Sequence, residues 1–135
     1  MMDQRHIKRL HTVQNLYSYS FHAKKTKSKI PFKKDLVTDE VMKYLAQIDK
    51  HIQNHAPKYP LEKIAKIDIS ILRLAVYELL FKNTEPVKVI INEAIELAKE
   101  LGNDRSYAFV NAVLGSLYIQ ITTKEHSYEP ETESA

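Results

Sequence analysis

Two sets of side chains in this sequence have the types and spacing that acid–base or metal chemistry needs. His51 and His55 stand four residues apart, which places two potential metal ligands on one helix face. Glu93, Glu96 and Glu100 share another helix face, as paired catalytic carboxylates would. The histidines lack an intervening glutamate and a third ligand, and the glutamates lack a partner that would tune a pKa. We therefore interpret both sets as solvated surface side chains.

The composition closes other routes to covalent chemistry. The chain has no cysteine, which excludes thiol nucleophiles, disulfides and cysteine-ligated zinc. Its glycines are Gly102 and Gly115 alone, so the sequence cannot form a glycine-rich loop that cradles phosphate. We expect a protein that is not an enzyme and that uses neither a cofactor nor a metal.

The N-terminal segment offers binding chemistry instead. It carries cations that can neutralise phosphates, amides that can read base edges and rings on which bases can stack, the three groups that recognise single-stranded RNA. These side chains are Arg5, His6, Lys8, Arg9, Gln14, Asn15, Tyr17 and Tyr19. The same pattern also fits an ordinary helix with Tyr17 in the core and its charges in water.

The charge of the chain is concentrated at one end. Residues 1–34 hold nine Lys/Arg against the single Asp3, a charge of +8, whereas residues 35–135 sum to −5. Six of those lysines lie within 22–34, which has no periodic apolar face, so we predict a flexible basic loop there. This polarity suits contact with a polyanion, although a basic loop can also serve solubility alone.

Helices must position these groups, because glycine and proline are sparse and apolar residues recur every three to four positions. We predict helices over about 5–20, 35–55, 69–82, 86–101 and 106–122. The third is apolar nearly all round and should be central. The first should turn one stripe toward the core: Ile7, Leu10, Val13, Tyr17 and Phe21.

Three residues should set helix ends. Asp68 is predicted to cap the start of the third helix, and Pro86 to pre-form the first turn of the fourth. Gly102 should close the fourth helix in a left-handed conformation. We expect one domain over 1–122, large enough to bury a core, and a disordered acidic tail over 123–135.

The sequence shows neither a signal peptide nor an apolar run near the roughly 20 residues that cross a bilayer. We expect a cytoplasmic protein that does not bind membranes.

Residues 69–118 contain three ordered motifs, Ser70–Leu79, Pro86–Lys99 and Ala108–Leu114, with Gly102 between the last two. Together they resemble the NusB family of transcription antitermination factors. The family's Ala-Ile-Leu-Arg-Leu-Ala-Xaa-Tyr-Glu-Leu helix corresponds to Ser70–Leu79, and its Pro-Xaa-Lys-Val-Ala-Ile-Asn-Glu-Ala-Val-Glu-Leu-Ala-Lys stretch to Pro86–Lys99. A glycine follows in both, and the family's Lys-Phe-Val-Asn-Gly-Val-Leu corresponds to Ala108–Leu114. Arg5–Tyr17 resembles the family's arginine-rich first helix, which ends in Gln-Xaa-Leu-Tyr.

The resemblance implies an all-α bundle of two sub-bundles, the first short of a helix because 22–34 is shorter and richer in lysine than the family pattern. It also implies a non-enzymatic adaptor that binds boxA-type nascent ribosomal RNA together with NusE, a ribosomal small-subunit protein, in the antitermination complex of RNA polymerase. A homodimer stays open, since some family members self-associate.

Position in the family pattern, together with the chemistry of the first helix, assigns the site residues. RNA contacts are expected at Arg5, His6, Lys8, Arg9, Gln14 and Tyr17. Contacts with NusE are implied at Asp68, Asp104, Arg105 and Phe109. Arg105 departs from the family, which often has an acid there.

Two other functions remain open at this point. The chain could be a recruiting domain related to the NusB-like domain of rRNA cytosine methyltransferases. It could also be a helical protein-interaction module that binds no RNA, if the basic loop only adds solubility.

Overall fold

The computed structural model describes residues 3–21 and 35–134, with side chains as far as Thr123. The basic loop predicted over 22–34 lies outside the described residues. In chain order the elements are α1 (Gln4–Phe21), α2 (Leu36–Lys43), α3 (Leu45–His55), η1 (Leu61–Lys63), α4 (Lys66–Val76), η2 (Tyr77–Lys82), α5 (Val87–Leu101) and α6 (Ser106–Ser134). Within the described ranges every regular element is a helix.

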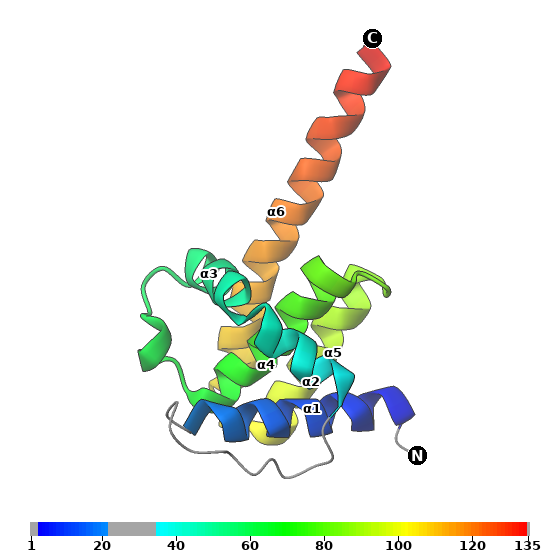
Figure 1. Ribbon diagram of the computed structural model, residues 1–135. Helices are drawn as coiled ribbons and strands as arrows, with labels where there is room; N and C mark the ends of the chain where they lie inside the picture. The colour runs from blue at the N-terminus through cyan, green and yellow to red at the C-terminus, as the bar shows by residue number, and fades with distance from the viewer. Residues whose placement is uncertain (1–2, 22–34, 135) are drawn as a thin grey trace.

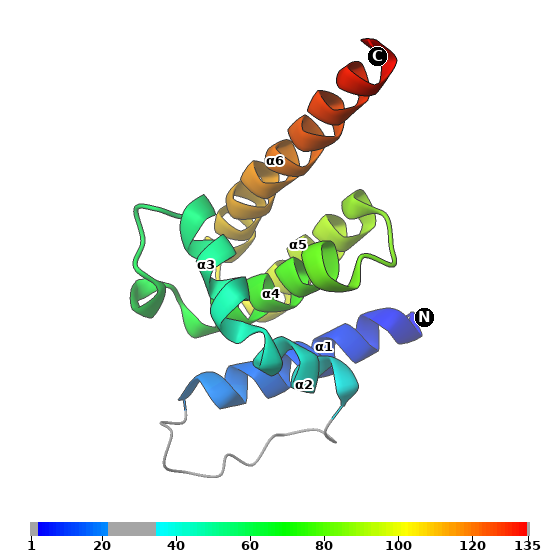
Figure 2. The same ribbon diagram turned by 45° about the horizontal axis from the view of Figure 1, so that its top comes forward.

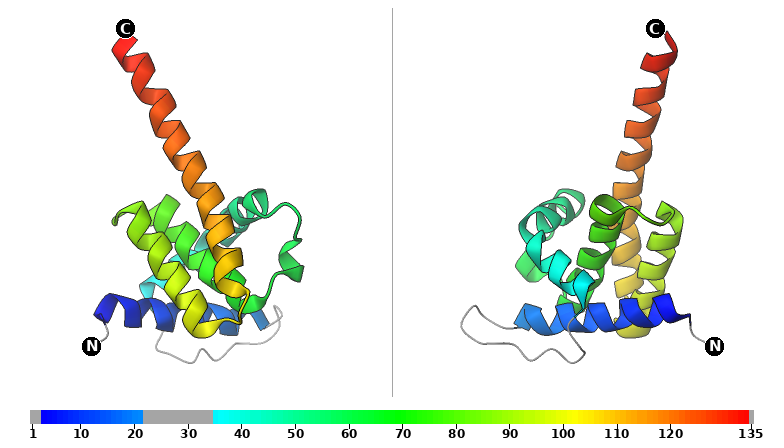
Figure 3. Two further views of the ribbon diagram at one scale, coloured as in Figure 1. Left: turned by 180° about the vertical axis from the view of Figure 1, so that it is seen from behind. Right: turned by 45° about the vertical axis from the view of Figure 1, so that its right-hand side comes forward.

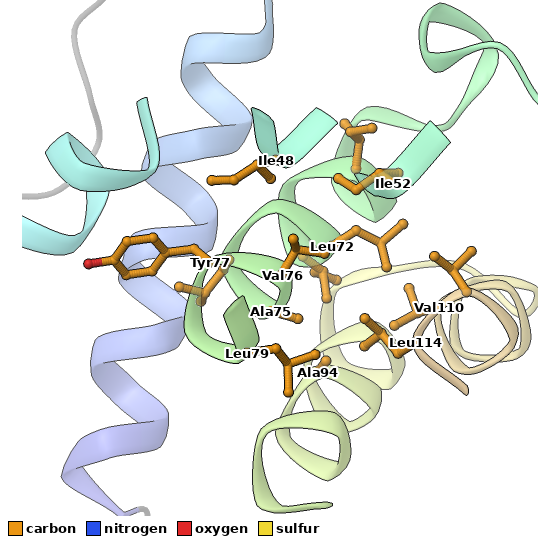
Figure 4. Close-up of a cluster of buried hydrophobic side chains, with 14 of the residues drawn as sticks. Ile48, Ile52, Leu72, Ala75, Val76, Tyr77, Leu79, Ala94, Val110 and Leu114 are labelled. Carbon is orange, nitrogen blue, oxygen red and sulfur yellow. The ribbon is translucent and has the colours of Figure 1, made fainter. Parts of the chain in front are cut away.

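α4 is the central helix of the bundle (Figure 4), as its sequence predicted. Every residue from Asp68 to Val76 except Arg73 is buried, because α4 packs against α1, α3, α5 and α6. Leu72 of α4 and Ile48 of α3 are fully buried, and burying such a side chain contributes about 1.5–3 kcal/mol.

α1 lies across one end of the bundle, opposite the projecting end of α6 (Figures 1 and 3). Its bounds agree with the predicted helix, and Val13 and Leu16 are buried against the core. The predicted core stripe is wrong at its end, because Tyr17 is 37% and Phe21 54% exposed. The Phe21 ring contacts Lys66, the first residue of α4. The last turn of α1 therefore lies beside the N-terminal end of α4 and is covered less than the turns before it.

The single helix predicted over 35–55 is two helices that meet at Tyr44. Asp35 caps α2 by accepting a hydrogen bond from the Thr38 amide at 2.7 Å. The break allows α2 to pack on α1 while α3 packs on α4 and α6 (Figure 2). The Tyr44 ring stacks on Phe81, with ring centroids 5.0 Å apart.

α4 starts earlier than predicted, and Asp68 is not its N-cap. Ala65 occupies the cap position, and Asp68 lies in the first turn with 7% of its surface exposed. A carboxylate there still faces the positive end of the helix dipole. The same chain continues as the π-helical turn η2 and ends at Asn83 in a left-handed conformation, φ 49°.

The end of α5 also differs from the prediction. Gly102 is extended, with φ −93° and ψ −170°, and not left-handed. A glycine is needed for space, since a Cβ would stand 2.3 Å from Ser106 Oγ and 2.8 Å from the Ala98 carbonyl. Pro86 sits at the N-cap of α5, one residue before the first turn.

α6 continues to Ser134, so the predicted helix end near Thr122 is too early. Its C-terminal part projects from the bundle in every view (Figures 1 to 3). Tertiary packing supplies most of the stability of protein helices. The disorder of 123–135 in solution therefore stays a prediction.

Candidate nucleic-acid interface

Arg9 of α1 lies inside the bundle, surrounded by carboxylates. Its Nε donates to Glu78 Oε2 at 2.9 Å and its Nη2 to Glu78 Oε1 at 2.8 Å. Nη1 donates to Glu93 at 3.2 Å, and Nη2 also contacts Glu85. These carboxylates, Glu78 above all, raise the pKa of Arg9 above its usual range. With 8% of its surface exposed, Arg9 holds α1 on the bundle and offers little surface to a phosphate.

His6 joins the same helix to α5. Its Nε2 is 3.0 Å from Glu100 Oε1 and its Nδ1 is 3.4 Å from Glu93 Oε2. A ring with a carboxylate at each nitrogen can donate to both only as an imidazolium. The hydrogen bond to Glu100 raises the pKa of His6, against partial burial, which lowers it.

The glutamates of α5 are therefore not the simple solvated face that their spacing predicted. Glu93 and Glu100 bind α1, whereas Glu96 is more than half exposed and pairs with Lys99 at 3.5 Å. They line a groove of about 530 Å³ between α1 and α5. Their carboxylates are engaged in ion pairs and not arranged around a nucleophile.

Arg5 and Lys8 are the predicted cations that remain at the surface. The Arg5 side chain is 72% exposed and its Nη1 lies 3.1 Å from Glu85. Lys8 is exposed on the next turn of the helix. Both can reach a phosphate without disturbing the core.

The other predicted RNA contacts lie further along α1. Gln14 and Tyr17 are three residues apart, whereas Lys8 precedes Tyr17 by nine residues, which at about 3.6 residues per turn places these two on opposite sides of the helix. Gln14 is half-buried, and its Oε1 has no hydrogen-bond partner among the described residues. The Tyr17 ring meets the Phe21 ring edge to face, with centroids 4.7 Å apart.

The residues predicted to face a protein partner gather at the start of α6. Asp104 and Arg105 are exposed in the turn before the helix, and Phe109 is half-buried. The Phe109 ring packs edge to face on Tyr59, at 5.5 Å between centroids. Tyr59 was not foreseen, although an aromatic residue beside Pro60 in a turn is a signal for an exposed contact.

Asp68 is buried near the same end of α6. Burial raises the pKa of its carboxyl, and a hydrogen bond from Ser106 lowers it in part. Its Oδ1 has no hydrogen-bond partner in the described structure. Asp68 therefore lies beneath the surface formed by Asp104, Arg105 and Phe109 and is not exposed to a partner.

His51 and His55 of α3 do not form a metal site. His55 Nδ1 lies 2.8 Å from Ser116 Oγ and its Nε2 lies 2.6 Å from Gln120 Oε1, which ties α3 to α6. Over the described ranges, no group of three or more His, Asp or Glu side chains could hold a metal ion. No described helix is both long and apolar enough to span a bilayer.

Comparison with known proteins gives a family match over most of the chain. The sequence profile of the NusB family matches residues 6–118. A transcription antitermination protein NusB of Clostridium tetani is 47% identical over 74 residues, which cover 55% of this chain and 48% of that protein. The NusB of Chloroherpeton thalassium is 34% identical over 140 residues, covering 92% and 65% respectively. The chain spans about half to two thirds of the length of these curated relatives.

Solved structures agree on the fold. T. maritima NusB superposes with a TM-score of 0.72 and 29% identity, over 85% of this chain and 90% of that one. NusB in a crystal structure with NusE and double-stranded RNA gives a TM-score of 0.65 at 19% identity, over 87% and 99%. At that lower identity the likeness concerns the fold alone. Both matches confirm the predicted all-α bundle.

Proposed function

The chain belongs to the NusB family, and on this premise we propose that it is a non-enzymatic transcription antitermination factor. In this proposal it binds boxA-type nascent ribosomal RNA together with NusE, as an adaptor of the RNA polymerase antitermination complex in the cytoplasm.

The observation that carries the RNA part is the set of side chains that α1 leaves at its surface. Lys8 and Tyr17 are exposed and Gln14 is half-buried, and they supply a cation, a ring and an amide along α1, the groups that recognise single-stranded RNA. Arg5 adds a second exposed cation near the N-terminal end of the helix. Arg9 and His6, which the sequence also predicted as RNA contacts, support these side chains by fixing α1 against α5.

The start of α6 supports the protein-partner part. Asp104 and Arg105 present both signs of charge beside the half-buried Phe109, an arrangement of a polar rim around an aromatic anchor that protein interfaces share. Residues 35–135 carry a net charge of −5, which complements a basic ribosomal protein.

The RNA part is tested by the affinity for a short boxA-type RNA as a function of salt. Each phosphate neutralised on a single strand contributes about −0.7 to the log–log slope. Lys8→Ala should weaken binding and make the slope shallower by about that amount. Lys50→Ala, an exposed lysine on α3, is the matched control and should change neither. No detectable affinity would contradict RNA binding, and an affinity that does not depend on salt would contradict the phosphate contacts.

The partner part is tested by co-purification with NusE and the same RNA. A complex that assembles with both, and that Phe109→Ala weakens, supports the adaptor role. If NusE binds equally well after nuclease treatment and no RNA is retained, the chain is a protein-interaction module without an RNA role. The mass of the free protein in the same experiment shows whether two copies associate.

A further inference from the structure

The last turn of α1 exposes an aromatic pair beside a lysine of another helix. Phe21 is 54% and Tyr17 37% exposed, and their rings meet at an interplanar angle of 79°. The Nζ of Lys66, the first residue of α4, lies 5.4 Å from the centroid of the Phe21 ring. Three side chains from two helices thus form one small surface cluster, which we call the Phe21 cluster.

Among the described residues, the exposed rings of this cluster add little to the buried core. Leaving a phenylalanine in water forfeits much of the free energy that its burial would give. The apolar stripe of α1 already fills the core with Val13 and Leu16, which are 0% and 1% exposed. A polar side chain at position 21 would be less unfavourable in water than the exposed ring. We therefore interpret the ring as part of a ligand site.

We propose that the Phe21 cluster is a nucleobase site: an unpaired base stacks on the Phe21 ring, and Lys66 binds the phosphate next to that base. The proposal rests on the proposed RNA function and adds Phe21 and Lys66 to its contacts. The edge contact with Tyr17 restricts the Phe21 ring, which lowers the entropy that a flexible ring would lose on stacking.

Charge and continuity select RNA over a protein partner. Lys66 is exposed at the start of α4, so a cation borders the Phe21 ring on that side. The apolar surface is limited to two rings, which is small for the core of a protein interface. Phe21 follows Tyr17 by one helical turn, about 6 Å along the axis. The cluster therefore adds a ring next to Tyr17, on the side of α1 that faces the start of α4.

A second lysine-over-ring pair shows what distinguishes the cluster. Lys99 lies 5.5 Å from the ring centroid of Tyr107, which is 45% exposed. There, however, the lysine is paired with Glu96 at 3.5 Å, and the acidic groove of α5 is adjacent. A phosphate would be repelled at that place, which makes Tyr107 a matched negative control.

The test measures the affinity of a labelled short boxA-type RNA for four variants of the full chain. Phe21→Ala should weaken binding about tenfold with an unchanged salt slope, because a stacking contact is lost and no charge is. Phe21→Tyr keeps a ring and should retain the affinity of the wild type. Lys66→Met should make the salt slope shallower by about 0.7. Tyr107→Ala should bind as the wild type does.

A second RNA series locates the stacked base. Replacing nucleotides one at a time by abasic ones should reveal one position at which Phe21→Ala causes no further loss. Circular dichroism melting of each variant confirms that it is folded, as expected for exposed positions.

The outcomes separate this proposal from the proposed function. If wild type binds the RNA and Phe21→Ala binds equally well, the nucleobase site is wrong while the RNA function stands. If Phe21→Ala keeps its RNA affinity but loses NusE, the cluster is a protein contact, which also overturns the proposal. If the wild type does not bind the RNA, both fail.

Discussion

The two halves of α1 differ both in residue type and in surroundings: residues 4–12 carry its arginines, lysine and histidines, and residues 13–21 carry its tyrosines and phenylalanine. In the N-terminal half, Arg9 and His6 are held by carboxylates of α5, η2 and the loop between them. In the C-terminal half, the rings of Tyr17 and Phe21 face solvent beside Lys66. A basic residue on an amphipathic helix is therefore not evidence of RNA contact until the groups opposite it are known. The N-terminal half holds α1 on α5 through buried ion pairs, and the C-terminal half packs on the core through Val13 and Leu16 while leaving two rings at the surface.

The largest expected effect comes from removing the anchor. Arg9→Ala leaves the buried Glu78 carboxylate without its partner, which costs about 3–5 kcal/mol of the free energy of unfolding. Lys8→Ala, the exposed neighbour, should change that free energy by no more than about 0.5 kcal/mol. Urea unfolding followed by circular dichroism compares the two. Equal stabilities would show that Arg9 does not anchor α1.

The anchor also depends on where α5 ends. Gly102→Ala places a Cβ against Ser106 and the Ala98 carbonyl, and overpacking of this kind costs about 1–3 kcal/mol. Gly115→Ala is the control, because its Cβ meets no atom within 4 Å and alanine is the better helix former. Thermal melting should lower the Tm of the first variant and raise that of the second. A tolerated Gly102→Ala would contradict the close approach.

The His6 bridge should make the N-terminal half depend on pH. The pKa of His6 is raised in the folded protein, so the bridge stabilises fully below the unfolded pKa of about 6.5 and is lost as pH rises through the folded pKa. The difference in unfolding free energy between wild type and His6→Gln should shrink between about pH 5.5 and about pH 8.5, the range over which the His6 imidazole titrates. A difference that is constant with pH would rule out the imidazolium bridge.

The smallest effect on stability is expected at Arg5. Its ion pair with Glu85 involves a side chain that is 72% exposed, and such surface pairs contribute about 0–1 kcal/mol. Arg5→Ala should therefore melt close to the wild type while its RNA salt slope becomes shallower by about 0.7. A large loss of stability would show that Arg5 helps to hold α1 on the bundle, which would contradict its assignment to the binding surface.

The helical framework could be predicted because its signals are local. α4 is apolar nearly all round and is central, and the bounds of α1 agree with its periodicity. The break at Tyr44 could not be foreseen, since it depends on α2 and α3 packing against different helices. The exposure of Phe21 depends on where α4 begins, which periodicity fixes only to within a turn.

The prediction of the site relied on residue type, and it was incomplete because burial depends on contacts far apart in the sequence. Arg9 was placed at the surface because its partners Glu78, Glu85 and Glu93 come from far along the chain. One signal was present: Glu78 is an acid within an otherwise apolar helix, and a buried carboxylate needs a cation. That observation would have pointed to a buried arginine before the fold was known.

The division of α1 is tested most directly by the RNA affinity of one anchor variant and one surface variant at the same salt. Arg9→Met combined with Glu78→Leu removes the buried ion pair, and Glu85 and Glu93 keep Arg5 and His6 as partners. Tyr17→Ala instead removes an exposed ring. We expect Tyr17→Ala to weaken RNA binding about tenfold, and the folded double variant to stay within about twofold of the wild type. The reverse result, with RNA binding lost in the folded double variant and kept in Tyr17→Ala, would contradict the account.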